Sequence, residues 1–336
     1  MPEPSFLHRL PVFLFSIALV VMFVAGTLNL RAVQERTLHV GGGEISIEIL
    51  DGPFSVGTDA LVNWIETGAR AVTAYYGKFP VPRVRVAVNA FDGDGVRSGT
   101  TDGRNGEATI SISVGRSTTA RQLQEDWMIT HEMVHLAFPS VNRAHHWIEE
   151  GIATYVEPWA RIRIGNLTPE KVWGDLVRDM PQGLPESGDQ GLDRTHTWGR
   201  TYWGGALFCL VADIEIHERT SSRKGFQDAL RAINRSGSIL DDWDLEKALE
   251  LGDKATGTGV LENLYQRMAN HPFDPDLDRY WRDLGVRLAD RDRYTVTLDD
   301  SAPLAAARKD IESGSRGRHK RKGDSGGPKS PPRNTE

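Results

Sequence analysis

The chain has 336 residues, of which 39% are hydrophobic and 26% charged, and its formal net charge is -6. These values are ordinary for a globular protein with a sizeable buried core, and they show no general preference for nucleic acid. The single cysteine, Cys209, excludes an intramolecular disulfide and a cysteine-ligated zinc site. It lies in the apolar run ALFCLVADI, where we expect a core residue.

Residues 1–31 contain an uncharged apolar run, LPVFLFSIALVVMFVAGTLNL, which is long enough to cross a bilayer as a helix. A cleaved signal peptide is the alternative, with VAG before Thr27 as the processing site. In both cases we expect the rest of the chain to leave the cytoplasm, either anchored in the membrane or secreted or periplasmic. The membrane is a partner only if this segment is retained.

Residues 37–117 predict a small lobe of mixed strands and helix. The segments EISIEIL and RVRVAVNA alternate apolar and polar residues, as half-buried strands do, and EATISISVG is a further strand. DALVNWIETGARAVTAYYG has the periodicity of an amphipathic helix, whereas FDGDGVRSGTTDGRNG is typical of turns.

Helical patterns dominate residues 118–311. The expected helices are residues 118–138, 147–164, 169–180, 198–220, 225–235, 241–251 and 261–269. A short strand, a turn and a short helix follow in residues 288–311. A small sheet lobe followed by a helical lobe is an α+β arrangement.

The C-terminal segment, residues 312–336, is rich in Gly, Ser, Pro and basic residues and nearly free of apolar ones. Such a composition does not repay the entropy of folding, so we expect a disordered tail. Its cluster RGRHKRK could touch nucleic acid or anionic lipid. A solvated tail is the more common outcome, and no nucleic-acid partner is expected.

The stretch WMITHEMVHLAF places His131 and His135 four residues apart, on one face of a helix. Two neutral imidazoles make half of a tetrahedral zinc site, and Glu132 is placed to act on a nearby water as general base. The alternative is an ordinary amphipathic helix with both histidines in solvent. A catalytic zinc site also needs a third protein ligand and one open position.

The following segment, HHWIEEGIATYVE, offers Glu149, Glu150 and Glu157 as carboxylate ligands. His145 and His146 do not fit the motif in which a glycine and a third histidine follow closely. These two histidines are expected either near the mouth of the site or as polar residues of an inter-helix turn.

HEMVH followed by WIEEGIATY resembles the gluzincin zinc metallopeptidases, whose third ligand is the glutamate of a W-x-x-E-G-x-A motif. The match of Trp147, Glu150 and Gly151 implies Glu150 as the third ligand of one zinc ion. Glu149 is its competitor or a hydrogen-bonding neighbour. The short separation between His135 and Glu150 is similar to that of the smaller gluzincins, including those like glycyl aminopeptidase. The resemblance implies a thermolysin-like zincin domain, and the small Gly151 and Ala153 are expected to let this helix pack close to the first.

RTYWGGALFCLVADIEI resembles the Y-x-x-G-A segment of many gluzincins, in which the tyrosine stabilises an oxyanion. This implies Tyr202 as a catalytic hydrogen-bond donor, because a phenol is neutral at pH 7 and donates one directional hydrogen bond. A buried tyrosine packing beside Trp198 and Trp203 is the alternative, and His196 is the other candidate donor.

In the same family an edge strand just before the metal helix pairs with the substrate backbone, which implies this role for EATISIS. The aminopeptidase branch carries a G-x-M-E-N motif there, and NGEATIS does not match it; Glu107 is the nearest substitute. The predicted function is a zinc peptidase acting on peptides or proteins, with Glu132 as general base. A catalytically inactive, membrane-tethered zinc protein that serves as an extracytoplasmic binding module is the alternative.

Overall fold

The computed structural model describes residues 34–314. The apolar segment of residues 10–30 lies outside this range, as does the tail beyond Gly314. Within residues 34–314, no helix is both long and apolar enough to cross a membrane. The first residues of the predicted tail, Glu312 and Ser313, form the end of helix α11 (Ala305–Ser313).

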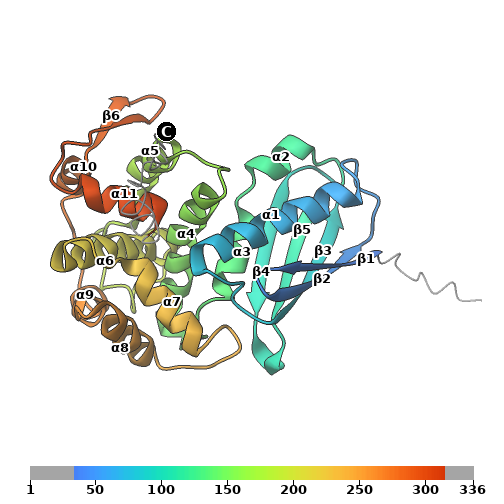
Figure 1. The fold of residues 1–336 in the computed structure, drawn as a ribbon, viewed down its shortest axis with the longest axis horizontal. Coiled ribbons are helices and arrows are strands. Elements are labelled where there is room, and N and C mark those ends of the chain that lie inside the picture. The colour runs from blue at the N-terminus through green and yellow to red at the C-terminus, as the bar shows by residue number, and fades with distance from the viewer. Residues whose placement is uncertain (1–33, 315–336) are drawn as a thin grey trace, which may run out of the picture. The chain divides into compact units, whose positions relative to one another are not determined.

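One lobe is built on a five-stranded sheet with the order β1-β2-β3-β5-β4 (Figure 1). The three central strands run parallel, and the two edge strands pair antiparallel with their neighbours. The strands are β1 (Gln34–Val40), β2 (Gly43–Leu50), β3 (Arg83–Phe91), β4 (Val96–Asp102) and β5 (Thr109–Gly115). The predicted mixed lobe is therefore present.

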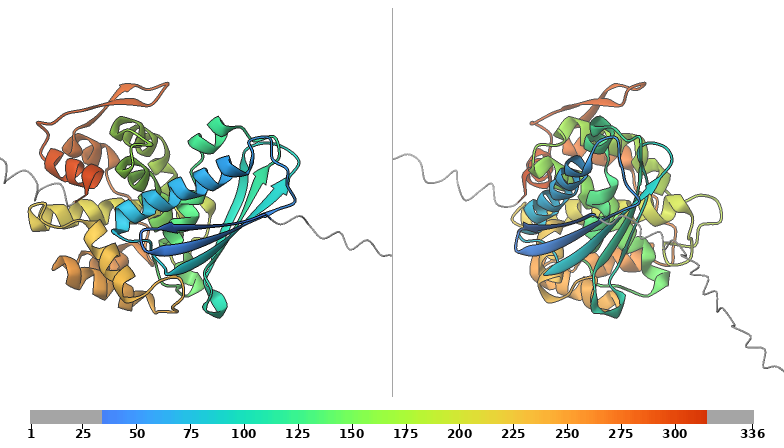
Figure 2. Two further views of the ribbon diagram at one scale, coloured as in Figure 1. Left: turned by 45° about the vertical axis from the view of Figure 1, so that its right-hand side comes forward. Right: turned by 90° about the vertical axis from the view of Figure 1, so that its right-hand side faces the viewer.

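Alternation of apolar residues buries one face of this sheet. Ile47, Val86 and Ile110 are cross-strand neighbours and are at most 1% exposed. Helix α1 (Thr58–Tyr76) lies along this face, and its apolar stripe completes the core (Figure 1). Among the described residues no helix covers the opposite face, whose strands turn toward the viewer in the right panel of Figure 2.

Strand β4 lies inside residues 91–106, which the sequence pattern assigns to turns. Its sequence, VRSGTTD, has no apolar alternation because small and polar residues occupy both of its faces. β4 pairs with β5 alone, so β4 is the sheet edge and β5 lies between β3 and β4. The expectation that EATISIS forms the edge strand is therefore wrong.

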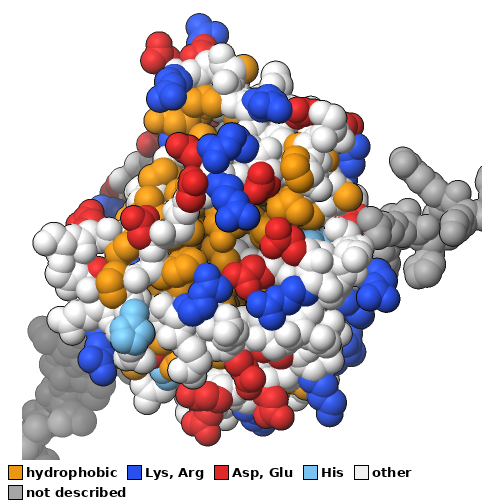
Figure 3. Space-filling model, turned by 90° about the vertical axis from the view of Figure 1, so that its left-hand side faces the viewer, with side chains coloured by type: hydrophobic (Ala, Val, Ile, Leu, Met, Phe, Trp, Pro, Cys, Tyr) orange, Lys and Arg blue, Asp and Glu red, His pale blue; other side chains and the backbone are white. Residues whose placement is uncertain are grey.

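The helical lobe follows the sheet and matches the predicted α+β architecture. Figure 3 views it from the side remote from the sheet, where hydrophobic side chains lie among charged ones. Its helices are α2 (Ala120–Glu125), α3 (Met128–His135), α4 (His146–Arg163), α5 (Pro169–Asp179), α6 (Gly205–Thr220), α7 (Phe226–Ser236), α8 (Leu245–Thr256), α9 (Val260–Met268), α10 (Leu277–Leu284) and α11, with the hairpin β6 (Val286–Asp290) and β7 (Thr295–Leu298) before α11. Cys209 is fully buried in α6, as expected.

The helix expected at residues 118–138 is divided into α2 and α3. The backbone of Asp126 is extended, with ψ 143°, which ends α2. The Asp126 carboxylate then accepts a hydrogen bond from the backbone N–H of Met128 at 3.0 Å and starts α3. The helix expected at residues 198–220 likewise begins with a π-helical turn, η4 (Arg200–Gly204), before α6.

Two glycines bring α4 and α6 into backbone contact. A Cβ atom on Gly151 would fall 2.2 Å from the carbonyl carbon of Gly205, and one on Gly205 would fall 2.0 Å from the carbonyl oxygen of Trp147. Gly151 therefore allows α4 to pack closely against α6. The expectation from the sequence, that it allows close packing against α3, is wrong.

Candidate metal centre

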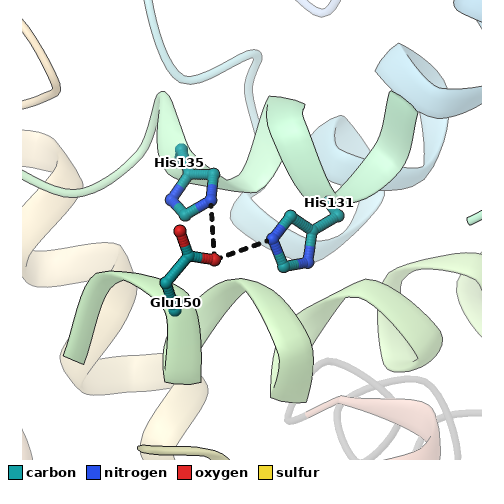
Figure 4. A group of neighbouring side chains, drawn as sticks. All are labelled: His131, His135 and Glu150. Atoms are coloured by element: carbon teal, nitrogen blue, oxygen red, sulfur yellow. Dashed lines mark hydrogen bonds and ion pairs between the residues drawn. The ribbon is translucent and has the colours of Figure 1, made fainter. Parts of the chain in front are cut away.

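Three predicted ligands converge between α3 and α4. His131 and His135 lie one turn apart on α3, and Glu150 points up at them from α4 (Figure 4). Glu150 Oε2 is 3.1 Å from His131 Nε2 and 3.6 Å from His135 Nε2. One donor atom from each side chain lies within 4.8 Å of the others, a grouping compact enough to hold a single ion.

The three side chains are largely withdrawn from solvent, and their pKa values shift accordingly. Burial raises the pKa of Glu150, but hydrogen bonds from His131, His135 and His146 outweigh it and hold that pKa below its usual range. Burial lowers the pKa of His131. Burial also opposes protonation of His135, but the hydrogen bond to Glu150 prevails and raises its pKa. The centre therefore carries a carboxylate beside a neutral His131.

The donor set suits zinc. Two imidazole nitrogens and one carboxylate oxygen are the ligands of a catalytic zinc site that keeps a fourth position for water or substrate. A cleft of about 690 Å³ is lined by His131, His135 and Glu150, so a fourth position would face open space. The residues present fit the metal.

Glu132 also lines this cleft and is held from the sheet edge. The Thr101 hydroxyl on β4 donates to Glu132 Oε2 at 2.7 Å. Gly99, two residues earlier on β4, passes directly over the same carboxylate, and a Cβ there would fall 2.5 Å from Oε1. Sequence reasoning missed Thr101 and Gly99 because they lie in a stretch whose composition indicates turns.

Tyr202, in the π-helical turn η4, also lines the cleft. Its ring stacks over His131 with centroids 6.3 Å apart, and over Trp198 at 5.6 Å. Burial, and then the negative charges of Glu150 and Glu132, raise the pKa of Tyr202 to about 12. Tyr202 thus keeps its proton at neutral pH beside the site, and it also packs on Trp198, as the alternative interpretation expects.

Three other glutamates considered from the sequence, Glu149, Glu157 and Glu107, do not join the ligand group. Glu157 is paired with Arg161 at 2.9 Å. Glu149 Oε1 accepts from the backbone N–H of Val141 at 3.3 Å. Glu107 lies outside the cleft beside Arg85, with 3.5 Å between the charged groups. The aminopeptidase role considered for Glu107 therefore has no support from its position.

The neighbouring histidines separate into different environments. His146 lines the cleft, and hydrogen bonds to Glu149 and then Glu150 raise its pKa to about 10. His145 turns away, with Nδ1 2.8 Å from an oxygen of Asp193. His196 is exposed and does not line the cleft. Of the three, only His146 lies where it can affect the metal centre.

One end of the cleft is bounded by the loop between α7 and α8, which sequence reasoning did not connect to the site. Ser140 forms a backbone bridge with Asp242, and both residues line the cleft together with Ile239. Such long-range pairing leaves no local sequence signal. The loop gives the cleft a wall beside the end of β4.

Comparison with known proteins agrees with this architecture. The sequence matches no known protein-family profile and no curated protein. The aminopeptidase N family protein from Idiomarina loihiensis aligns with a TM-score of 0.55 at 12% identity, covering 76% of this chain and 49% of that one. The M1 zinc metallopeptidase from Deinococcus radiodurans aligns with a TM-score of 0.47 at 15% identity, covering 73% and 54%. The chain thus spans about half the length of these structures, and the first shows that it shares its fold with that aminopeptidase N family protein.

Proposed function

We propose that this protein is a zinc-dependent peptidase. The observation that carries the proposal is the convergence of His131, His135 and Glu150 at a cleft in which Glu132 is the adjacent carboxylate. This donor set leaves a coordination position free, and the neighbouring carboxylate supplies the base that hydrolysis needs. The fold shared with the aminopeptidase N family protein supports the same reaction class.

A zinc ion held there would polarise the scissile carbonyl and lower the pKa of the attacking water. Glu132 removes a proton from that water and later delivers it to the leaving amine, so that it ends each cycle ionised. Thr101 keeps the carboxylate of Glu132 in one orientation during both transfers. Tyr202 donates its phenolic proton in a hydrogen bond to the oxyanion of the tetrahedral intermediate.

We further propose that an extended peptide binds along β4. This strand pairs with β5 on one side only, and its residues Gly99 to Asp102 line the cleft. Unpaired backbone groups at a sheet edge are the usual site for adding a peptide strand. Peptides and unfolded protein segments are therefore the substrates that the geometry favours.

Zinc quantification and digestion of a peptide library test the proposal, using the parent protein, Glu132→Gln and the matched control Glu107→Gln. We expect about one zinc per chain in all three and a loss of hydrolysis of about 10²–10⁴-fold in Glu132→Gln alone. Parent-like hydrolysis by Glu132→Gln would remove this residue from its role. A parent protein that holds zinc but cleaves no peptide would instead favour the binding-module alternative.

An extracytoplasmic location is a separate proposal, based on the apolar segment of residues 10–30. Whether that segment is retained as an anchor or cleaved is decided by the N-terminal sequence and membrane partition of the protein purified from its host.

A further inference from the structure

The two carboxylate oxygens of Glu150 have different surroundings. Oε2 faces the metal position, between His131 and His135. Oε1 lies 3.3 Å from Nε2 of His146. The carboxylate is therefore divided between a metal-facing oxygen and an oxygen held by a neighbouring side chain.

His146 is itself fixed by a second carboxylate. Its Nδ1 is 2.9 Å from Glu149 Oε2. The other oxygen of Glu149 accepts from the backbone N–H of Val141, in the connection between α3 and α4. His146, Glu149 and Glu150 all lie in the first turns of α4, at spacings of three and four residues that bring side chains together. A continuous set of contacts thus runs from the Val141 backbone to the carboxylate of Glu150.

We propose that His146 is a positioning residue that holds Glu150 as a one-oxygen metal ligand, and that Glu149 fixes His146 for this task. An oxygen engaged by His146 is not available for a second bond to the metal, so the fourth coordination position stays open for water or substrate. This inference rests on the proposed zinc site.

The position of His146 distinguishes this role from direct ligation and from a simple surface ion pair. His146 is not part of the compact group of donor atoms formed by His131, His135 and Glu150. Each of its two ring nitrogens faces a carboxylate oxygen, Nδ1 at 2.9 Å from Glu149 and Nε2 at 3.3 Å from Glu150. Its side chain is 48% exposed, and its removal therefore leaves no buried cavity.

The adjacent His145 provides a matched control. It is the same residue type one position away, yet its Nδ1 pairs with Asp193 and it does not line the cleft. A loss of zinc affinity caused by general disturbance at the start of α4 would appear in His145→Ala as well. A loss caused by release of Glu150 would appear only at His146 and Glu149.

The first measurement is the zinc dissociation constant, obtained by competition with a chromophoric chelator. We expect the dissociation constant to rise by about 10–100-fold in His146→Ala, the range typical for residues that orient a metal ligand. Glu149→Ala should raise it as well, and the double variant should be no weaker than His146→Ala, because both residues act through one contact. His145→Ala should bind zinc like the parent.

The second measurement is the visible absorption of the cobalt-substituted protein, which weakens when a four-coordinate ion gains a fifth ligand. We expect weaker absorption in His146→Ala, where Glu150 Oε1 is free to bind the ion. His146→Gln, which retains a donor near the position of Nε2, should recover most of the parent spectrum and affinity.

The outcomes separate the inference from the proposed function. If the parent binds zinc tightly, and His146→Ala binds it equally well or better with an unchanged cobalt spectrum, the positioning role is wrong and the peptidase proposal stands. Additive effects in the double variant would also overturn the role assigned to Glu149. A parent protein that does not bind zinc would overturn both proposals.

Discussion

Gly99 of β4 and Glu132 of α3 lie so close together that a side chain at position 99 would displace the carboxylate. An ideal Cβ at Gly99 would fall 2.5 Å from Oε1 of Glu132 and 2.7 Å from its Cγ. The sheet edge and the candidate general base are therefore in direct contact. This contact is possible because Gly99 has no side chain.

Gly99→Ala tests this contact. The atoms in conflict belong to the side chain of Glu132, so we expect the carboxylate to move while the strand and the zinc ligands stay in place. A displacement of about 1 Å at a catalytic group can lower turnover by about 10²-fold, and we expect a fall in kcat of that order with unchanged zinc content. Ser111→Ala, on the exposed face of β5, is the control and should keep parent activity. Full activity in Gly99→Ala would show that Glu132 needs no such exact placement.

Tyr202→Phe tests the oxyanion donor. Because the pKa of Tyr202 is raised to about 12, the phenol keeps its proton at neutral pH and can donate a hydrogen bond. Removal of one such donor typically costs about 10²–10³-fold in kcat, so we expect a loss in that range with little change in KM or zinc content. The ring still stacks on Trp198 in the variant, which separates the hydroxyl from the packing. A parent-like kcat would leave Tyr202 with the packing role alone.

Much of the metal centre can be predicted from the sequence because its signals are local. His131 and His135 are one helical turn apart, and Glu150 lies in the first turns of the next long helix, so helical periodicity and a short connection are sufficient to bring them together. The three parallel strands β2, β3 and β5 and the covering helix α1 are predictable for the same reason, since each shows its own periodicity.

The parts that escaped prediction depend on contacts between distant segments. Strand β4 is ordered by pairing with β5 and by contact with α3, neither of which leaves an apolar pattern in VRSGTTD. Gly151 signals a close approach, but nothing in the local sequence shows that its partner is Gly205 of α6. The break between α2 and α3 depends on the carboxylate of Asp126, which accepts a hydrogen bond from the backbone N–H of Met128.

Gly205→Ala tests the contact between α4 and α6. The added methyl group would meet the carbonyl oxygen of Trp147, a backbone atom that cannot move without shifting a helix. We expect the free energy of unfolding to fall by about 1–3 kcal/mol, as measured by urea denaturation. In the control Gly68→Ala on α1 the nearest atoms are side-chain atoms at 3.2 Å or more, so the fall should be smaller. Equal changes in the two variants would contradict a special role for the helix crossing.

Asp126→Asn tests how the start of α3 responds to pH. Burial raises the pKa of Asp126 to about 6, against the hydrogen bonds from Ile129 and Met128 that lower it. A carboxyl with a raised pKa binds its proton more tightly in the folded state than in the unfolded state. Its contribution to stability is therefore present below about pH 4 and lost as the pH rises through 6.

Asparagine keeps an acceptor for those N–H groups but never ionises. Relative to the parent, the stability of Asp126→Asn should therefore increase between pH 4 and pH 7.5, by about 1–2 kcal/mol. Urea denaturation of both proteins across this range measures the difference in their free energies of unfolding. The contributions of the other titrating groups are common to both proteins and largely cancel in this difference. A flat difference between parent and Asp126→Asn would show that folding does not shift the pKa of Asp126. A difference that falls with pH would show that folding stabilises the carboxylate; either outcome contradicts the expectation.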